Sequence, residues 1–306
     1  MKNQSDCHYG RVLASHGGVE VVACETCGYA HIFPLPEEGN REDFYRNDFY
    51  KTFSEDYIRK HEEDKAWWSI EHNEKYERFE KYLASRNQIK TILDIGSGPG
   101  FFLKAGSDRG WEVQGIEPGE IAWLHSVEVL GLKVHHAYFK KSNAKSFGTF
   151  DVVHLNNVLE HVVNASEVIA LSHGIINKNG IISVTVPNDF SPLQDIVANH
   201  LGKGPWWVVP QQHTNYFDLS SLKRLLESNG FVTIYYTASF PMELFLLMGD
   251  DYVGNDQLGR KMHAKRKQFE IAMDASGKTA LKRKLYDTLA ELDLGRQITV
   301  MARKIS

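Results

Sequence analysis

The sequence has little cysteine, no long apolar run and no marked excess of either charge. Its three cysteines, Cys7, Cys24 and Cys27, all lie near the start of the chain. An odd number of cysteines in one short segment does not build a disulfide framework, so a reducing, cytoplasmic location is predicted. No segment approaches the roughly 20 apolar residues that span a bilayer, and the first residues lack the apolar stretch of a secretory signal, so membrane insertion is not expected.

The charge balance argues against nucleic acid as the partner. The chain has 35 basic and 39 acidic residues, a formal net charge of -4, which is not the basic footprint of a protein that binds phosphate backbones. Hydrophobic residues make up 42% of the 306 residues, enough for a core that needs no disulfide or metal to be stable. The composition therefore favours an ordinary globular protein whose substrate is a small molecule.

Three segments differ in pattern along the chain. Residues 1–40 hold the cysteines, scattered glycines and a proline-containing end, which predicts a small zinc-ribbon-like N-terminal module. Residues 41–88 are rich in aromatic and charged residues at helical spacing and predict a helical linker or lid. Residues 89–306 predict the main domain, with a helical insertion at about 241–292 before the last strand.

Strand and helix patterns alternate throughout the main domain. Alternation at this spacing predicts an α/β fold, Rossmann-like and doubly wound, with a mostly parallel seven-stranded sheet covered on both faces. Ligands of such sheets bind at the carboxyl ends of the strands, near the point where the strand order reverses. The strand candidates are Thr91–Ile95, Glu112–Glu117, Lys133–His135, Phe150–Leu155, Gly180–Pro187, Phe231–Thr237 and Gln297–Arg303.

The strongest local signal is a glycine-rich turn at residues 93–100, directly after the first strand candidate. Glycines there permit positive φ angles and let a ligand approach the backbone closely. A dinucleotide turn has the pattern Gly-x-Gly-x-x-Gly, but Phe101 takes the third glycine position and Pro99 has no N–H for a pyrophosphate. An acid beside the turn repels a pyrophosphate and suits a cofactor that carries an amino group and a sulfonium. The candidate cofactor-binding residues of the turn are Asp94, Gly96, Ser97, Gly98 and Gly100.

A second cofactor signal is the acid Glu117, which ends the second strand candidate 21 residues after Gly96. A carboxylate at this position of the fold accepts hydrogen bonds from both ribose hydroxyls of a nucleoside. The alternative is that Glu117 only flanks the turn made by Pro118-Gly119. The glycine turn and the acid together indicate a cofactor site much more strongly than either motif does alone.

With these motifs, residues 90–240 resemble the core of the class I methyltransferases that depend on S-adenosylmethionine (SAM). The resemblance implies a SAM-dependent enzyme that methylates a small molecule at oxygen, nitrogen or carbon. It also implies that Ala137 and Tyr138 lie near the adenine of the cofactor and Asn156 near its methionine part. The segments that carry the resemblance are Thr91–Gly100, Gly115–Pro118, Phe150–Leu155, Asn157–Val162 and Leu222–Phe231.

The segment from Cys24 to Gly28 has the Cys-x-x-Cys-Gly form of a zinc knuckle, in which small residues let the backbone wrap a tetrahedral metal. The partner knuckle is incomplete, because Gly10 stands where its second cysteine belongs. The alternative to a metal is a degenerate module held by packing alone. The candidate ligands of a structural zinc are Cys7, Cys24 and Cys27, with His8, His16 or His31 to complete the set.

With this module, Phe33–Pro36 and the segment 44–50, most of the chain resembles the deoxysugar methyltransferases and their relatives in surface-polysaccharide and natural-product clusters. That resemblance implies a sugar or a natural-product intermediate as the methyl acceptor.

Two histidines compete for the role of general base, which typically adds about 10²–10⁴-fold to a rate. His161 follows the fourth strand candidate and His213 follows the fifth. In the sugar C-methyltransferases the segment around His213 reads Glu-His before a Tyr-Phe pair, but Gln212 replaces the glutamate here. Since Gln212 cannot take a proton, methylation of carbon by the same mechanism is disfavoured. The alternative is that both histidines are structural.

Three other functions compete with methyl transfer to a small molecule. Enzymes that methylate base amines carry an Asn/Asp-Pro-Pro-aromatic segment after the fourth strand, where residues 156–159 here read Asn-Asn-Val-Leu. An NAD-dependent oxidoreductase is disfavoured by Phe101 and Pro99. A non-catalytic SAM-fold subunit stays open on the sequence alone.

Overall fold

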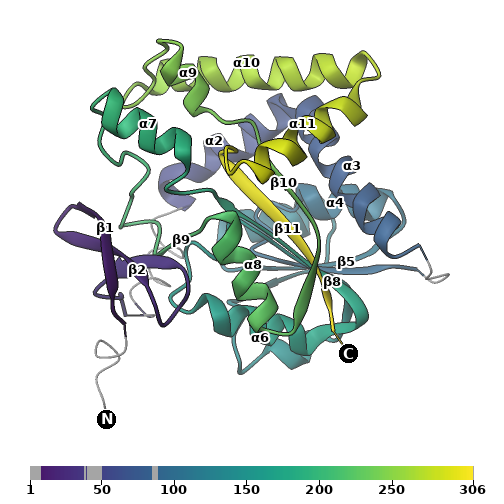
Figure 1. The fold of residues 1–306 in the computed structure, drawn as a ribbon. Coiled ribbons are helices and arrows are strands. Elements are labelled where there is room, and N and C mark those ends of the chain that lie inside the picture. Colours follow the sequence, from purple (N-terminus) through teal and green to yellow (C-terminus); the bar gives the residue numbers. More distant parts are fainter. Residues whose placement is uncertain (1–7, 38, 40–49, 85–88, 306) are drawn as a thin grey trace.

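The computed structural model describes residues 8–37, 39, 50–84 and 89–305, which form two β-sheets and the helices around them (Figure 1). The larger sheet has seven strands. The smaller sheet has four strands, comes mainly from the N-terminal residues, and stands beside the larger one. None of the helices described combines the length and the apolar composition needed to cross a membrane.

The seven-stranded sheet has the strand order β10-β11-β8-β7-β4-β5-β6. β4 pairs in parallel with β5 and β7, so the carboxyl ends of these three strands lie together. β11 runs antiparallel to both of its neighbours. The predicted mostly parallel, doubly wound sheet is thus confirmed. Its strands are β4 (Thr91–Ile95), β5 (Glu112–Glu117), β6 (Val134–His136), β7 (Phe150–Asn156), β8 (Ile176–Pro187), β10 (Phe231–Ala238) and β11 (Gln297–Lys304).

Helices fill the connections between the strands. Three of them lie between β10 and β11, where the sequence predicted a helical insertion. The helices are α2 (Tyr50–Glu63), α3 (Lys65–Tyr82), α4 (Phe101–Asp108), α5 (Glu120–Leu124), α6 (Ala165–Ile175), α7 (Pro192–His200), α8 (Leu219–Ser228), α9 (Glu243–Leu247), α10 (Asp256–Ala275) and α11 (Thr279–Glu291), with the π-helix η3 (His125–Val129) and the 3₁₀-helix η4 (Ala144–Phe147).

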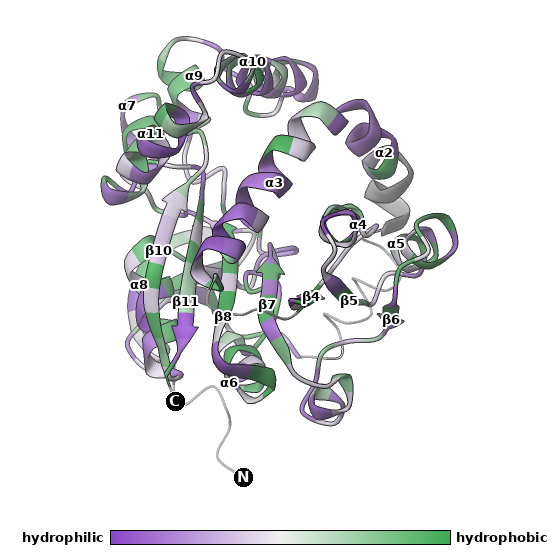
Figure 2. Ribbon diagram, turned by 90° about the vertical axis from the view of Figure 1, so that its right-hand side faces the viewer, coloured by the Kyte–Doolittle hydropathy of each residue, from purple (hydrophilic) through white to green (hydrophobic). Residues whose placement is uncertain are grey.

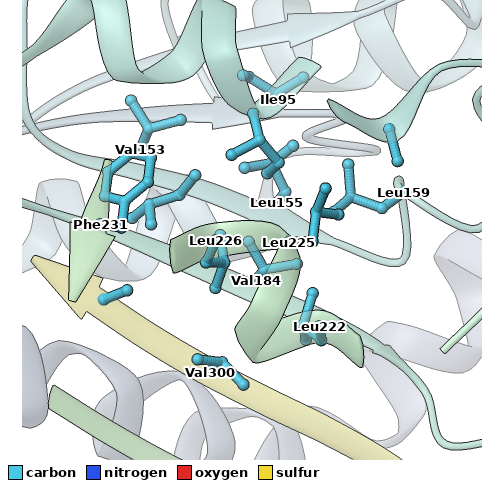
Figure 3. Packing of buried hydrophobic residues seen from close by; sticks show 14 of the residues in the cluster. Ile95, Val153, Leu155, Leu159, Val184, Leu222, Leu225, Leu226, Phe231 and Val300 are labelled. Carbon is cyan, nitrogen blue, oxygen red and sulfur yellow. The ribbon is translucent and has the colours of Figure 1, made fainter. Parts of the chain in front are cut away.

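The strands of the large sheet bury both of their faces because their side chains alternate between two apolar cores. On one face, Leu155 and Val184 pack with Leu225 of α8, as Figure 3 shows, and α6 contributes to the same core. On the other face, Ile92 and Val152 pack with residues of α3 and α4. The polar positions on the α3 face then cluster at the carboxyl ends of the strands.

The small sheet has the order β1-β2-β3-β9 and joins the N-terminal residues to the main domain. Its fourth strand comes from far along the chain: Ala30 pairs with Tyr216, and His31 pairs with Asn215. The two described cysteines lie where β2 turns into β3. The strands are β1 (Gly10–His16), β2 (Val19–Cys24), β3 (Ala30–Phe33) and β9 (Asn215–Tyr216).

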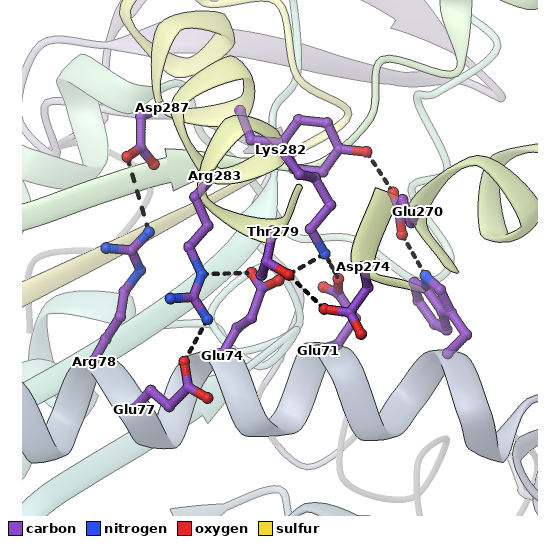
Figure 4. A network of polar contacts seen from close by, with 12 residues as sticks. Glu71, Glu74, Glu77, Arg78, Glu270, Asp274, Thr279, Lys282, Arg283 and Asp287 are labelled. Carbon is purple, nitrogen blue, oxygen red and sulfur yellow. Dashed lines mark hydrogen bonds and ion pairs between the residues drawn. The ribbon is translucent and has the colours of Figure 1, made fainter. Parts of the chain in front are cut away.

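A buried network of charged and polar groups joins α3 to α10 and α11 (Figure 4). Its centre is Glu270, which is fully buried. One carboxylate oxygen of Glu270 accepts hydrogen bonds from Arg266 Nε (3.0 Å) and Tyr286 Oη (2.6 Å), and the other accepts one from Trp67 Nε1. Lys282, also buried, lies 2.8 Å from Glu74 of α3. The network fixes the inserted helices against α3.

We expect Glu270→Ala to lower the free energy of unfolding by about 3–5 kcal/mol, because it leaves Arg266 buried without its partner. The matched control is Lys104→Ala, which breaks an exposed ion pair between Lys104 and Asp108, one helical turn apart. This change should lower the free energy of unfolding by less than about 0.5 kcal/mol. Urea denaturation followed by circular dichroism measures both. Equal losses in the two variants would show that the network does not stabilise the fold.

Candidate functional site

The carboxyl ends of β4, β5 and β7 open into a cleft of about 1930 Å³, which residues of α2, α3 and α10 also line. Figure 2 shows the backbone of α2, α3 and α4 beside these strands. Pockets for one ligand usually measure about 300–1,000 Å³, so this cleft has room for two ligands side by side. Most of the predicted cofactor residues line it together, namely Asp94, Gly96, Ser97, Gly98, Glu117, Ala137, Tyr138 and Asn156.

Two glycines of the turn are required by its geometry. Gly96 has φ +71°, and a Cβ there would lie 2.7 Å from the side chain of Val158. Gly100 has φ +85°, is the N-cap of α4, and would place a Cβ 2.7 Å from Ser126 Oγ. Gly100 is therefore set behind the turn and shapes it, while Gly96 faces the cleft.

Glu117 is held at the end of β5 by two backbone amides. Its Oε2 accepts a hydrogen bond from Gly98 N (2.8 Å), and its Oε1 accepts one from Gly119 N (2.7 Å). The side chain is only 2% exposed, yet it lines the cleft. The bond to Gly98 ties the acid to the glycine turn, so the two predicted parts of a nucleoside site form one unit.

Lys75 of α3 reaches the base of the cleft and was missed by the sequence analysis. Its Nζ donates hydrogen bonds to Asn156 Oδ1 (2.9 Å) and Thr185 Oγ1 (3.3 Å). It also lies 3.3 Å from Nε2 of His154, whose Nδ1 is 2.7 Å from Asp94 Oδ1. The helical spacing of α3 was visible in the sequence, but nothing there indicated that this lysine faces the strands.

The surroundings of Lys75 shift the pKa of its side-chain amine. Burial lowers the pKa of its amine to about 8, against the opposing effect of the carboxylates of Glu71 and Asp94. The amine is therefore charged at neutral pH and loses its proton a little above it.

An aromatic stack fixes α2 and α3 over the glycine turn. The ring of His61 lies 3.9 Å from that of Phe101, the first residue of α4, with 5° between the ring planes. Its other face stacks on Trp68 at 4.5 Å. Burial lowers the pKa of His61 to about 4, so its ring is neutral in this stack at ordinary pH.

The two histidines predicted as bases lie against each other at the far side of the cleft. The ring centroids of His161 and His213 are 5.1 Å apart in an edge-to-face arrangement. His161 lines the cleft, and His213 lies behind it. Nδ1 of His161 donates to the carbonyl oxygen of Gln212 (3.0 Å). The residue that departs from the sugar C-methyltransferase pattern thus orients His161 through its backbone.

Four potential metal ligands converge in the small sheet: His8, Cys24, Cys27 and His31. Nδ1 of His8 lies 3.6 Å and 3.4 Å from the sulfurs of Cys24 and Cys27, and 3.2 Å from Nε2 of His31. Ligands of a tetrahedral zinc with these donor types are about 3.3–3.6 Å apart, so the set fits that ion. Cys7 lies outside the described residues, and His16 is exposed at the end of β1.

A sequence profile described as a methyltransferase domain matches residues 67–236, which is 170 of the 306 residues. The chain belongs to the methyltransferase domain family. The matched segment runs from α3 to β10, so in this methyltransferase domain both Lys75 and the glycine turn lie within the family's own region.

Curated relatives of this methyltransferase domain include ubiquinone biosynthesis O-methyltransferases. The chain is 33% identical over 105 residues to the one from Pseudomonas paraeruginosa, which covers 32% of this chain and 45% of the relative. It is 29% identical over 146 residues to the one from Vibrio campbellii, covering 43% and 62%. The chain thus spans about half the length of the curated relatives it matches.

Solved structures confirm the class I, SAM-dependent methyltransferase fold. The 1,6-didemethyltoxoflavin-N1-methyltransferase of Burkholderia thailandensis, solved with its acceptor and S-adenosylhomocysteine (SAH), is similar with a TM-score of 0.53 and 14% identity over 97% of this chain and 100% of that one. The plantazolicin methyltransferase BpumL, in complex with SAH and a substrate analogue, has a TM-score of 0.52 and 15% identity over 88% and 95%.

We expect the ratio of the dissociation constants for SAM and SAH to fall as the pH rises through about 8. Lys75 donates to Asn156, which the resemblance implies lies near the methionine part of the cofactor. Below that pH we therefore expect the charged amine to repel the sulfonium of SAM but not the neutral sulfur of SAH. The repulsion between two unit charges about 6 Å apart is about 1–3 kcal/mol, so the ratio of the dissociation constants should change by a factor on the order of ten. Calorimetry between pH 7 and 9 measures it, with Lys75→Met as the variant that should show a flat ratio and Lys104→Met as the surface control. A flat ratio in the wild-type protein would place Lys75 away from the sulfonium.

Proposed function

We propose that this protein transfers a methyl group from SAM to an oxygen of a small-molecule acceptor. The observation that carries the proposal is that Glu117, the glycine turn and His161 all line the same cleft. The similar enzymes solved with SAH support SAM as the methyl donor.

Some residues of the cleft bind the cofactor, and others accept the proton of the acceptor. The glycine turn and Glu117 hold the nucleoside part, with the carboxylate exchanging its bonds to Gly98 and Gly119 for ribose hydroxyls. When bound, SAM supplies a methyl group that the acceptor oxygen takes as the C–S bond breaks, with the electron pair of that bond passing to sulfur. The proton of the acceptor hydroxyl leaves toward the pair of His161 and His213. Alignment of the two reactants in the cleft accounts for much of the rate, up to about 7–11 kcal/mol in ideal cases.

Oxygen is the proposed target because of the departure at Gln212 and because the curated relatives are O-methyltransferases. Within that proposal, the acceptor is a sugar or a natural-product intermediate, as the sequence resemblance implied. The size of the cleft leaves room for such a molecule beside the cofactor.

Binding of SAH tests the cofactor assignment, with NAD as the control ligand. We expect SAH alone to bind the wild-type protein in calorimetry, and Glu117→Ala to bind it at least about tenfold more weakly, because a site built for the ribose hydroxyls loses its acceptor. His213→Ala should bind SAH normally but lose about 10²–10⁴-fold in kcat with an acceptor found by screening. Absence of SAH binding to the folded wild-type protein would rule out the proposed function for this chain.

We further propose that His8, Cys24, Cys27 and His31 bind a structural zinc, so that residues 1–40 act as a metal-stabilised module. Two features support a zinc site. Cys27 N donates to Cys24 Sγ (3.4 Å), as in a zinc knuckle. Nδ1 of His31 donates to the carbonyl oxygen of Ile32 (2.8 Å), which leaves Nε2 as the ligand atom. His8 and His31 are two of the three histidines that the sequence analysis offered as further ligands, and Cys7 lies outside the described residues.

We expect the purified protein to contain one zinc per chain by elemental analysis, and Cys24→Ser to lose it and to unfold at a lower temperature, since ligand binding stabilises the folded state. His16→Ala is the control, because this exposed histidine is outside the ligand set and should leave the zinc content unchanged. Full zinc content in Cys24→Ser would contradict the assigned ligands, and zinc loss in His16→Ala would bring that residue into the set.

A further inference from the structure

A second group of potential ligands lies at the acceptor side of the cleft. One ligand atom each of Glu160, His161 and His213 lies within 4.8 Å of the other two. Glu160 and His161 are neighbours in a turn after β7, where both side chains turn to the same side: Nε2 of His161 is 3.8 Å from Oε1 of Glu160. No sulfur belongs to this group.

Glu160 is the unusual member of the group. Its side chain is about as buried as any in the protein, with 1% of the residue exposed, and its Oε2 has no hydrogen-bond partner among the described residues. A buried carboxylate is costly unless it is paired with a cation or coordinates a metal.

Hydrogen bonds connect the backbone of the two segments that carry the group. The carbonyl oxygen of Glu160 accepts hydrogen bonds from Thr214 N (2.7 Å) and Asn215 N (3.0 Å). The side-chain amide of Asn215 donates through Nδ2 to the carbonyl oxygens of Leu159 and Val162, both at 2.7 Å. The turn that carries Glu160 and His161 is therefore clamped to the segment that carries His213, so the three side chains are positioned before anything binds.

The orientation of His161 suits a ligand. Because the carbonyl oxygen of Gln212 can only accept, the Nδ1 of His161 carries the proton and Nε2 presents its lone pair on the side of Glu160. Metal-bound histidines usually donate their other N–H to a carbonyl or carboxylate in this way. One carboxylate and two imidazoles suit divalent transition ions such as Mn²⁺, Fe²⁺, Co²⁺ or Zn²⁺, and leave open coordination positions.

We propose that Glu160, His161 and His213 form a binding site for a divalent transition-metal ion at the acceptor side of the cleft. This inference deepens the proposed function: the histidines activate the acceptor as ligands and not as free bases. Because His161 lines the cleft, an ion held by these residues would have positions open to one or two oxygens of the acceptor. The preferred acceptor would then carry adjacent hydroxyl or carbonyl oxygens. A bound cation lowers the pKa of such a hydroxyl, and its proton passes to water in the open cleft.

The test measures Mn²⁺ binding to the untagged full-length protein after removal of metal with EDTA. Excess Mg²⁺ is present to occupy exposed carboxylates, because Mg²⁺ prefers oxygen ligands to imidazole. Loss of the electron paramagnetic resonance signal of free Mn²⁺ should give one bound ion per chain. We expect affinity about tenfold or more lower in Glu160→Gln and in His213→Asn, and unchanged in His16→Ala, because His16 is exposed and outside both groups of ligands.

A pulsed resonance measurement on the wild-type complex avoids any dependence on the folding of the variants. Bound Mn²⁺ should show couplings to two imidazole nitrogens. Absence of these couplings, no bound Mn²⁺ in the wild-type protein, or equal affinity in Glu160→Gln would overturn the proposed site. SAH calorimetry on the same samples separates the two proposals: SAH binding without Mn²⁺ binding leaves methyl transfer standing with the histidines as free bases, and loss of SAH binding in the wild-type protein rejects methyl transfer whatever Mn²⁺ does.

Discussion

The parallel pairing of β4 with both β5 and β7 is the constraint on which the rest of the structure depends. Parallel strands end at the same side of a sheet, so the glycine turn after β4, Glu117 at the end of β5 and Asn156 at the end of β7 meet in one cleft. The hydrogen bond from Gly98 N to Glu117 then links two of these ends directly.

Two attachments far from the strand pairing complete the cleft. The buried network around Glu270 holds α10 and α11 against α3, and α3 carries Lys75 into the base of the cleft. On the other side, β9 joins the small sheet to the main domain, and Asn215 of β9 clamps the turn after β7. Through this strand, the cysteine-containing module shares a boundary with the histidine pair.

Much of the fold was predictable because its signals are local. Short strand patterns that alternate with helical ones predict the seven strands, and the glycine turn needs positive φ angles that few other residues adopt. Lys75 and the convergence of His8 with His31 were not predictable in the same way. A lysine in an amphipathic helix normally points to solvent, and only the packing of α3 on the sheet shows that this one reaches Asn156 and Thr185 of the strands.

The sequence by itself determined the class of fold, the family and the glycine turn with its acid Glu117, because these depend on backbone geometry encoded in short consecutive motifs. The tertiary structure alone decided how the side of the cleft with His161 is built. His161 and His213 are 52 positions apart in the sequence, and their contact depends on the clamp made by Asn215 and on the pairing of β9 with β3. Such contacts between distant segments carry no local periodicity, so only the folded chain brings them together.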